Sequence, residues 1–308
     1  TAPFREIMAT RSVEEELQGT FVYTDIESGE EVTLDIGIRS RGRFRRKKEV
    51  CQFTPLRLNF RKTKGTLLAK SDKMKLVTHC RTRSTKYEQA LLKEYLAYRI
   101  LNTMTDWSFR VRLLQATYVE STTGKAIVTA SAFLIEHDDQ LARRVGMKID
   151  ESERTSVSAI DGPHTNLVST FQYLIGNTDF SPVQGPPGEA CCHNHVLLGD
   201  ETTSISVPYD FDVSGIVSPP HAVPNPRFKL ASVRQRLYRG RCANNEYLED
   251  TLQAWRDRKP MIYDVINSQE GLSDSERKRT VRYVNDFYKI IDSERQVGYR
   301  LVKACLGK

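Results

Sequence analysis

The chain has 308 residues, 39% of them hydrophobic and 28% charged, with a net charge of +7. This length can form one large domain or two lobes that share a cleft, and the composition is ordinary for a soluble globular protein. No apolar stretch is long enough to span a bilayer, which excludes an integral helical membrane protein, and the positive charge suits an anionic partner.

The first part of the chain predicts an antiparallel β-sheet with one helix. Residues 21–26 and 32–38 alternate between apolar and polar side chains and are separated by the turn residues 27–30, which is typical of a β-hairpin. Further strands are expected at 56–60, 73–77, 109–120 and 126–136, and a helix with apolar residues at three- and four-residue spacings at 85–104.

The second part is predicted to be mostly helical. A Gly- and Pro-rich loop is expected at 176–194, followed by two short apolar runs at 195–199 and 204–209 that lead to Asp210. Helices are expected at 164–175, 245–257, 260–268 and 273–292, the last with Ser273 and Glu276 in capping-box register. The fold class is therefore α+β, with a β-rich lobe at 1–138 and a helical lobe at 139–308.

The six cysteines are an even number at wide spacing: Cys51, Cys80, Cys191, Cys192, Cys242 and Cys305. Cys51 and Cys80 flank two predicted strands, and the adjacent pair 191–192 has Cys242 downstream. One or two disulfides and an extracytoplasmic location, periplasmic or secreted, are therefore expected. The alternative is a set of buried thiols in a cytoplasmic protein.

Three polar residues lie at the ends of predicted elements in the second part. Asp179 follows a helix, Asn194 precedes a strand, and Asp210 follows the next strand. Phosphoryl transfer needs a carboxylate that orients the attacking group and oxygen ligands that hold magnesium against the phosphates. Taken singly, each residue is typical of a turn or a cap. Taken together after a β-rich first part, their order predicts a kinase-like site.

The pattern resembles the spore-coat CotH kinase family and, more distantly, HipA-like kinases. The residues that carry the resemblance lie between about 32 and 215: Arg41-Gly42, Pro55 to Phe60, the 85–104 helix, Asn177-Thr178-Asp179, His193-Asn194 and Tyr209-Asp210-Phe211-Asp212. The resemblance implies a two-lobed protein-kinase-like fold, in which Asp179 is the catalytic carboxylate. Asn194 and Asp210 would hold Mg²⁺ or Mn²⁺, with Asp212 as the alternative to Asp210.

The resemblance also implies a basic residue that holds the phosphates of ATP. The strand 56–60 offers Arg57 where the family pattern has Lys, and Lys75 competes for the same role because it precedes the helix. A lysine in that position would pair with a helix carboxylate, either Glu94 or Glu88. Other cofactor-binding candidates are Glu136, at the predicted hinge, and Arg41 with Gly42 in a basic loop.

These features predict an ATP-dependent phosphotransferase that acts on a protein or small hydroxyl acceptor. One alternative is nucleotidyl (AMP) transfer on the same fold, since fold does not fix reaction. The other is a non-catalytic pseudokinase or a basic module that binds an anionic polymer through residues 39–64. The nucleotide is the expected partner, and nucleic acid is not expected.

Overall fold

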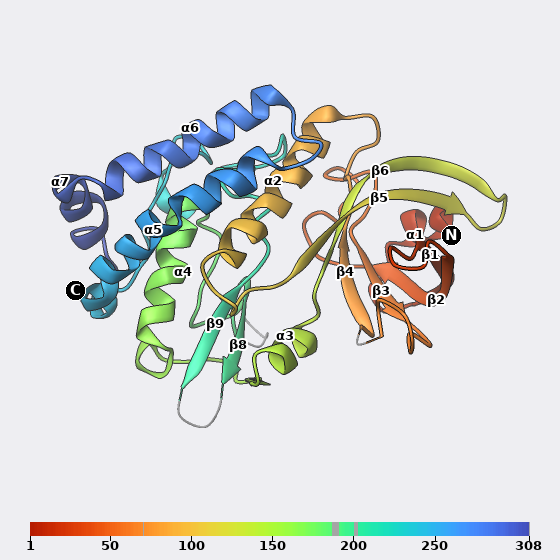
Figure 1. Ribbon diagram of the computed structural model, residues 1–308, viewed down its shortest axis with the longest axis horizontal. Helices are drawn as coiled ribbons and strands as arrows, with labels where there is room; N and C mark the ends of the chain where they lie inside the picture. Colours follow the sequence, from red (N-terminus) through yellow and green to blue (C-terminus); the bar gives the residue numbers. More distant parts are fainter. Residues whose placement is uncertain (70, 187–190, 200–202, 308) are drawn as a thin grey trace. The chain divides into compact units, whose positions relative to one another are not determined.

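The computed structural model describes residues 1–69, 71–186, 191–199 and 203–307. It is an α+β protein, as predicted, with an antiparallel sheet in the first part and most helices later (Figure 1). The chain divides into two compact units. Unit 1 comprises Thr1–Leu91 and Arg110–Gln140, and unit 2 comprises Leu92–Phe109 and Leu141–Lys308. The helix α2 (Thr85–Asn102) contributes residues to both units.

Unit 1 is built on a sheet with the strand order β1-β2-β3-β4-β6-β5, in which neighbouring strands are antiparallel. The strands are β1 (Leu17–Thr24), β2 (Glu31–Ser40), β3 (Leu56–Phe60), β4 (Lys73–Val77), β5 (Val111–Glu120) and β6 (Lys125–Ile135). The predicted hairpin is confirmed, since β1 and β2 pair from Leu17↔Ile38 to Thr24↔Glu31. In the turn between β1 and β2, Asp25 Oδ1 accepts hydrogen bonds from the main-chain N–H groups of Glu27 and Ser28.

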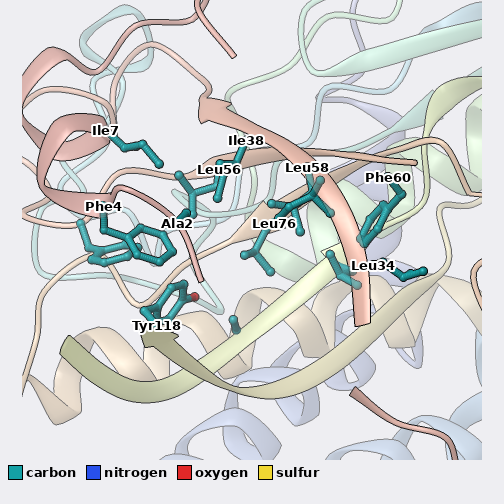
Figure 2. Packing of buried hydrophobic residues seen from close by; sticks show 14 residues of the cluster. Ala2, Phe4, Ile7, Leu34, Ile38, Leu56, Leu58, Phe60, Leu76 and Tyr118 are labelled. Atoms are coloured by element: carbon teal, nitrogen blue, oxygen red, sulfur yellow. The ribbon is translucent and has the colours of Figure 1, made fainter. Parts of the chain in front are cut away.

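Alternation along the central strands sends one set of side chains into a hydrophobic cluster (Figure 2). The cluster includes Ile36, Ile38, Leu56, Leu58, Phe60, Leu76 and Leu134. A helix that sequence reasoning missed, α1 (Phe4–Thr10), adds Phe4 and Ile7, and the Phe4 ring packs edge-on against Tyr118 with centroids 5.4 Å apart. Burial of each large side chain stabilises the unit by roughly 1.5–3 kcal/mol. Because side chains alternate along a strand, the residues between the buried ones on β2, β3 and β4 point to the opposite, polar face of the sheet.

Unit 2 combines helices with a small sheet of order β7-β8-β9. Its elements are the C-terminal part of α3 (Asp138–Arg144), β7 (Lys148–Ile149), α4 (Gly162–Ile175), β8 (His195–Gly199), β9 (Ser204–Pro208), α5 (Leu248–Asn267), α6 (Asp274–Ile291) and α7 (Glu294–Val297). Short 3₁₀ turns lie at Val157–Ala159, Pro226–Phe228 and Cys242–Tyr247, and a π turn at Gly298–Val302. Part of the predicted 176–194 loop, residues 187–190, lies outside the described residues.

The prediction of two helices at 245–257 and 260–268 is wrong, because α5 continues through Pro260. Trp255 and Ile266 on either side of the proline are fully buried, and the Trp255 indole N–H donates to Thr170 Oγ1 at 2.8 Å. A continuous buried stripe thus outweighs the local cost of an internal proline. The predicted start of α6 is confirmed, since Ser273 Oγ accepts the Glu276 N–H.

Each unit contains a long-range disulfide. Cys51–Cys80 lies in unit 1, as expected, and Cys242–Cys305 in unit 2. The expectation that Cys242 forms a disulfide with one of the two adjacent cysteines is wrong. Cys191 and Cys192 are joined to each other, while Cys242 N–H donates to Leu306 O and so lies beside Cys305. In the described ranges, no helix is long and apolar enough to cross a membrane.

Candidate active site

The loop that carries Asp179 begins at the C-terminal end of α4. Gly176 ends the helix in the left-handed conformation, φ +67°, and its N–H donates to the Gln172 and Tyr173 carbonyls. The fully buried Asn177 then accepts the Asp179 N–H through Oδ1 at 2.9 Å. Such an Asx turn fixes the local main chain. Asp179 therefore stands on a short, rigid loop.

Two neighbours hold the Asp179 carboxylate. Oδ1 lies 2.9 Å from His193 Nε2, and Oδ2 accepts from Asn194 Nδ2 at 3.2 Å. The same amide also donates to the Asp179 carbonyl at 2.6 Å. The hydrogen bond from His193 is the largest influence that lowers the pKa of Asp179, and the Asn194 amide adds to it against the effect of burial. The side chain is 43% exposed, so Asp179 is an ionised and accessible carboxylate.

The β8–β9 hairpin brings Asn194 and Asp210 together. His195 pairs with Pro208 at the open end of the hairpin, and Tyr209 N–H donates to Asn194 O at 2.9 Å. Asn194 and Asp210 both have left-handed main-chain conformations, with φ of 55° and 61°. Non-glycine residues in this conformation carry local strain and are frequent at functional sites. The hairpin thus supplies two adjacent polar residues in constrained conformations.

A buried aromatic residue fixes the segment that follows the hairpin. Phe211 is fully buried and packs against Tyr98 and Phe171, with ring centroids 4.5 and 5.2 Å away. Tyr98 Oη also accepts the Asp210 N–H at 2.9 Å. Asp210 and Asp212, both half-buried, flank this anchor. The contacts of Phe211 therefore fix the main chain on which both carboxylates stand.

A buried histidine holds the hairpin to α4. His195 is 1% exposed, its Nδ1 lies 2.8 Å from Ser206 Oγ, and its Nε2 lies 3.4 Å from Gln172 Nε2. Burial lowers the pKa of His195 to about 3, so the ring is neutral at physiological pH. It stacks on Phe180, the residue after Asp179. His195 is a structural support of the site and not an acid or base in it.

The donors in this cluster suit a hard cation. Asn194 donates to Asp179 through Nδ2, which leaves its amide oxygen as the atom that can bind a cation, and the carboxylates of Asp210 and Asp212 add oxygen ligands. Across the residues that the structure describes, no three His, Cys, Asp or Glu side chains form a metal site. Mg²⁺ commonly binds one or two carboxylates and takes its other ligands from phosphates and water. Carboxylate and amide oxygens are therefore the type of ligand atom that Mg²⁺ and Mn²⁺ bind.

Unit 1 aligns the two predicted phosphate-binding cations. Arg57 on β3 is in register with Arg39 on β2 and with Lys75 on β4, so the three side chains share the polar face of the sheet. Arg57 Nη2 lies 2.8 Å from His137 Nε2. Burial lowers the pKa of His137, so at neutral pH the ring is uncharged and accepts this hydrogen bond. Arg57 is thereby held beside Lys75.

Lys75 is held by an ion pair with Asp138, Nζ to Oδ1 3.0 Å. The two side chains are 16% and 28% exposed. Burial by itself would raise the pKa of Asp138, but the charge and hydrogen bond of Lys75 lead the opposing influences, and the pKa is lowered. The predicted pairing of Lys75 with Glu94 joins residues of different units and stays a prediction. Glu94 is buried on α2.

The remaining predicted residues have structural contacts. Glu88, the alternative to Glu94, accepts from Ser131 Oγ at 2.9 Å. Glu136 accepts the Arg110 N–H at 3.0 Å through its carboxylate, which joins the ends of β5 and β6.

In the basic loop, Arg41 N–H donates to Pro55 O. Gly42 has φ +76°, and its carbonyl accepts from Arg46 Nε at 3.0 Å. The loop is thus partly shaped by its own arginines.

Sequence reasoning did not select His193 or Arg239 as site residues. The sequence could have indicated His193, because it directly precedes the predicted site residue Asn194. Arg239 is 60 residues beyond Asp179 and only the fold brings it close; its Nη1 donates to the carbonyls of Thr178 and Phe180 at 2.9 and 2.6 Å. No local pattern marks such a contact.

Comparison with protein-family models, with curated proteins and with solved structures finds no match to this chain.

Proposed function

We propose that this protein is an ATP- and divalent-metal-dependent phosphotransferase of the atypical protein kinase type, which transfers phosphate to a protein or small hydroxyl acceptor. The observation that supports it best is the cluster in unit 2, where an ionised Asp179 is hydrogen-bonded to His193 and Asn194, and the Asn194 carbonyl accepts the N–H of Tyr209, the residue before Asp210. The two-lobed kinase-like arrangement and the resemblance to CotH-like kinases are parts of this proposal.

Asp179 is the proposed catalytic carboxylate. Because its pKa is lowered, it is ionised at neutral pH and can accept a hydrogen bond from an acceptor hydroxyl. His193 and Asn194 each bind one carboxylate oxygen and so restrict the rotation of the side chain. Orientation of the attacking hydroxyl is the main task of such a residue, since phosphoryl transfer needs little covalent chemistry from the protein.

Asn194 and Asp210, with Asp212 as the alternative, are the proposed ligands of Mg²⁺ or Mn²⁺. When bound, the metal would neutralise charge on the phosphate oxygens. Arg57 and Lys75 are the proposed phosphate-binding cations of unit 1, and both are already oriented by neighbours. The disulfides support an extracytoplasmic location as part of the same proposal.

The test uses ATP labelled on either the γ or the α phosphorus, with Mg²⁺ or Mn²⁺. We expect the γ label to reach the chain itself, a hydroxyl-bearing acceptor or water, and Asp210→Ala to prevent this. Asp250→Ala, at an exposed position in the first turn of α5, is the matched control. Transfer of the α label would indicate nucleotidyl transfer instead, and neither transfer nor release of either label would indicate a non-catalytic binding protein.

A further inference from the structure

The stretch that follows Asp212 is strongly and uniformly basic. Residues 213–245 contain no Asp or Glu, and their Lys and Arg residues are Arg227, Lys229, Arg234, Arg236, Arg239 and Arg241. A run of cations is usually a solvated face. Here Arg236 and Arg239 are half-buried in unit 2, while the exposed Arg234 donates to a main-chain carbonyl. None of the three has an ion-paired carboxylate within the described part of the chain.

We call Arg234, Arg236 and Arg239 the arginine strap. Each donates to main-chain carbonyls of a segment that leads to or from the candidate site. Arg234 Nη1 donates to Gly215 O at 3.4 Å, after Asp212, and Arg236 Nη2 donates to Leu174 O at 3.1 Å, in the last turn of α4. Carbonyls at the end of a helix lack intrahelical partners and carry negative partial charge, so they favour a cation.

Arg239 makes the most specific of these contacts. A single nitrogen, Nη1, donates to Thr178 O and Phe180 O, the carbonyls on the two sides of Asp179. Its guanidinium lies between two aromatic rings, with Cζ 4.7 Å from the Phe180 centroid and 4.9 Å from that of Phe228. A planar guanidinium can stack and donate at the same time, which an ammonium cannot do equally well.

Burying this cation has an energetic cost. Burial lowers the pKa of Arg239 to about 10, and the nearby charges of Arg227 and Arg241 act in the same direction. The Asp179 charge opposes them, although the two side chains form no ion pair. Arg239 is thus kept close to Asp179 at a cost that a residue serving packing alone would not require.

We propose that Arg239 is the positioning residue of Asp179, an inference that rests on the proposed function. It holds the carbonyls of Thr178 and Phe180, the residues on the two sides of Asp179, and so restricts the main chain from which the carboxylate projects. Arg239 does not contact the reacting atoms, and the arginine strap links the conformation of the segment after Asp212 to that of the Asp179 loop.

Hydrogen exchange of the ligand-free chain, measured by mass spectrometry, tests the positioning without reference to activity. Two amides report on the loop: Asp179 N–H donates to Asn177 Oδ1, and Ser181 N–H donates to His193 O. We expect Arg239→Gln to speed exchange in the peptide 176–186 by roughly tenfold to a hundredfold, since a hydrogen bond from a charged donor is lost. Arg239→Lys should show a smaller change.

Lys229→Gln is the matched control, because Lys229 is exposed on the same stretch and has no ion pair with any described residue. It should leave exchange in 176–186 unchanged. In both variants, exchange in β5 (111–120) of unit 1 should also be unchanged. If Arg239→Gln accelerated hydrogen exchange equally in β5 and in 176–186, the variant would be generally destabilised and the proposal would be overturned. Unchanged exchange in 176–186 would also overturn it.

Kinetics supply the second test. Arg239→Gln should lower kcat at least tenfold with the KM for ATP unchanged within about twofold, because the variant disturbs the placement of Asp179 and not the residues proposed to bind ATP. An unchanged kcat would overturn the proposal. A wild-type chain without any turnover would contradict the proposed function, while hydrogen exchange would still decide whether Arg239 holds the loop.

Discussion

The two units hold their candidate residues in opposite ways. In unit 1, Arg57 and Lys75 are aligned across two strands, and their charged groups are already bound by His137 and Asp138. In unit 2, Asp179 is held from one side by donors while 43% of its side chain stays exposed. The Asp179 carboxylate is therefore partly accessible, whereas the Lys75 ammonium group is already bound by Asp138.

This difference has a physical basis in where each residue stands. The cations lie inside regular strands, where register fixes their neighbours, and a charge that is mostly buried needs a partner. Asp179, Asn194 and Asp210 lie in turns at the ends of elements, where main-chain contacts determine the conformation and the side chain can remain partly exposed.

Asp179→Asn should lower kcat by about a thousandfold, because the variant keeps the size of the side chain but cannot accept a proton or orient a hydroxyl as a carboxylate does. The stabilisation by ATP and metal should persist, since Asn194 and Asp210 remain. Single-turnover kinetics and thermal denaturation measure the two effects. Retention of more than a tenth of the activity would exclude Asp179 as the catalytic carboxylate.

Removal of a disulfide should destabilise each unit separately. Cys242–Cys305 spans 63 residues and Cys51–Cys80 spans 29, so Cys→Ser pairs should lower the free energy of unfolding by about 4 kcal/mol, slightly more for the longer loop. Urea denaturation is the measurement, with Trp255 fluorescence following unit 2. A loss below about 1 kcal/mol for either pair would show that the disulfide does not constrain its unit.

Arg57 and Lys75 form a cation row on the polar face of the sheet, and Asp138 is the ion-pair partner of Lys75. Substitutions in this row should show whether Arg57 or Lys75 binds the phosphates. Loss of the true ligand, in Arg57→Gln or Lys75→Gln, should raise the Kd for metal–ATP by about tenfold, because a charge-assisted hydrogen bond is removed. If Lys75 is that ligand, Asp138→Asn should lower the Kd by a few fold, since the competing carboxylate is neutralised. Isothermal titration calorimetry measures each Kd. No change in any of the three variants would remove this row from the site.

The smallest effect concerns pH. Because the folded pKa of Asp138 is lowered, its contribution to stability is present above the ordinary aspartate pKa of about 3.9 and is lost as pH falls through the lower folded value. The stability difference between wild type and Asp138→Asn should therefore be constant from about pH 7 to 5 and should shrink at lower pH. Urea denaturation at several pH values checks this. A difference that shrinks between pH 7 and 5 would contradict the assignment.

Much of the fold could be predicted because local patterns and packing agree. The alternation in β2 and β3 and the capping serine of α6 each predict what the structure contains. Pro260 misled the prediction of α5 because a proline is a local signal, whereas the burial of Trp255 and Ile266 depends on tertiary packing. The partner of Cys242 was likewise decided by long-range contacts.

The candidate site was only partly predictable for the same reason. Residue type and order led to Asp179, Asn194 and Asp210, and the structure brings Asp179 and Asn194 into direct contact. The roles of His193 and Arg239 depend on distances that no spacing in the sequence conveys. The cation row is intermediate, since strand register follows from the alternation but the partners of Arg57 and Lys75 come from the segment after β6.

In the proposed function, Asn194 and Asp210 bind a divalent metal together with ATP beside Asp179. Thermal denaturation of the wild type and of Asp210→Ala, with ATP and with or without Mg²⁺ or Mn²⁺, tests it most directly, because a ligand that binds the native state raises its apparent stability. We predict a Tm increase that requires the metal and disappears in Asp210→Ala. The claim would be contradicted by an increase that needs no metal, by one that Asp210→Ala retains, or by no increase with ATP at all.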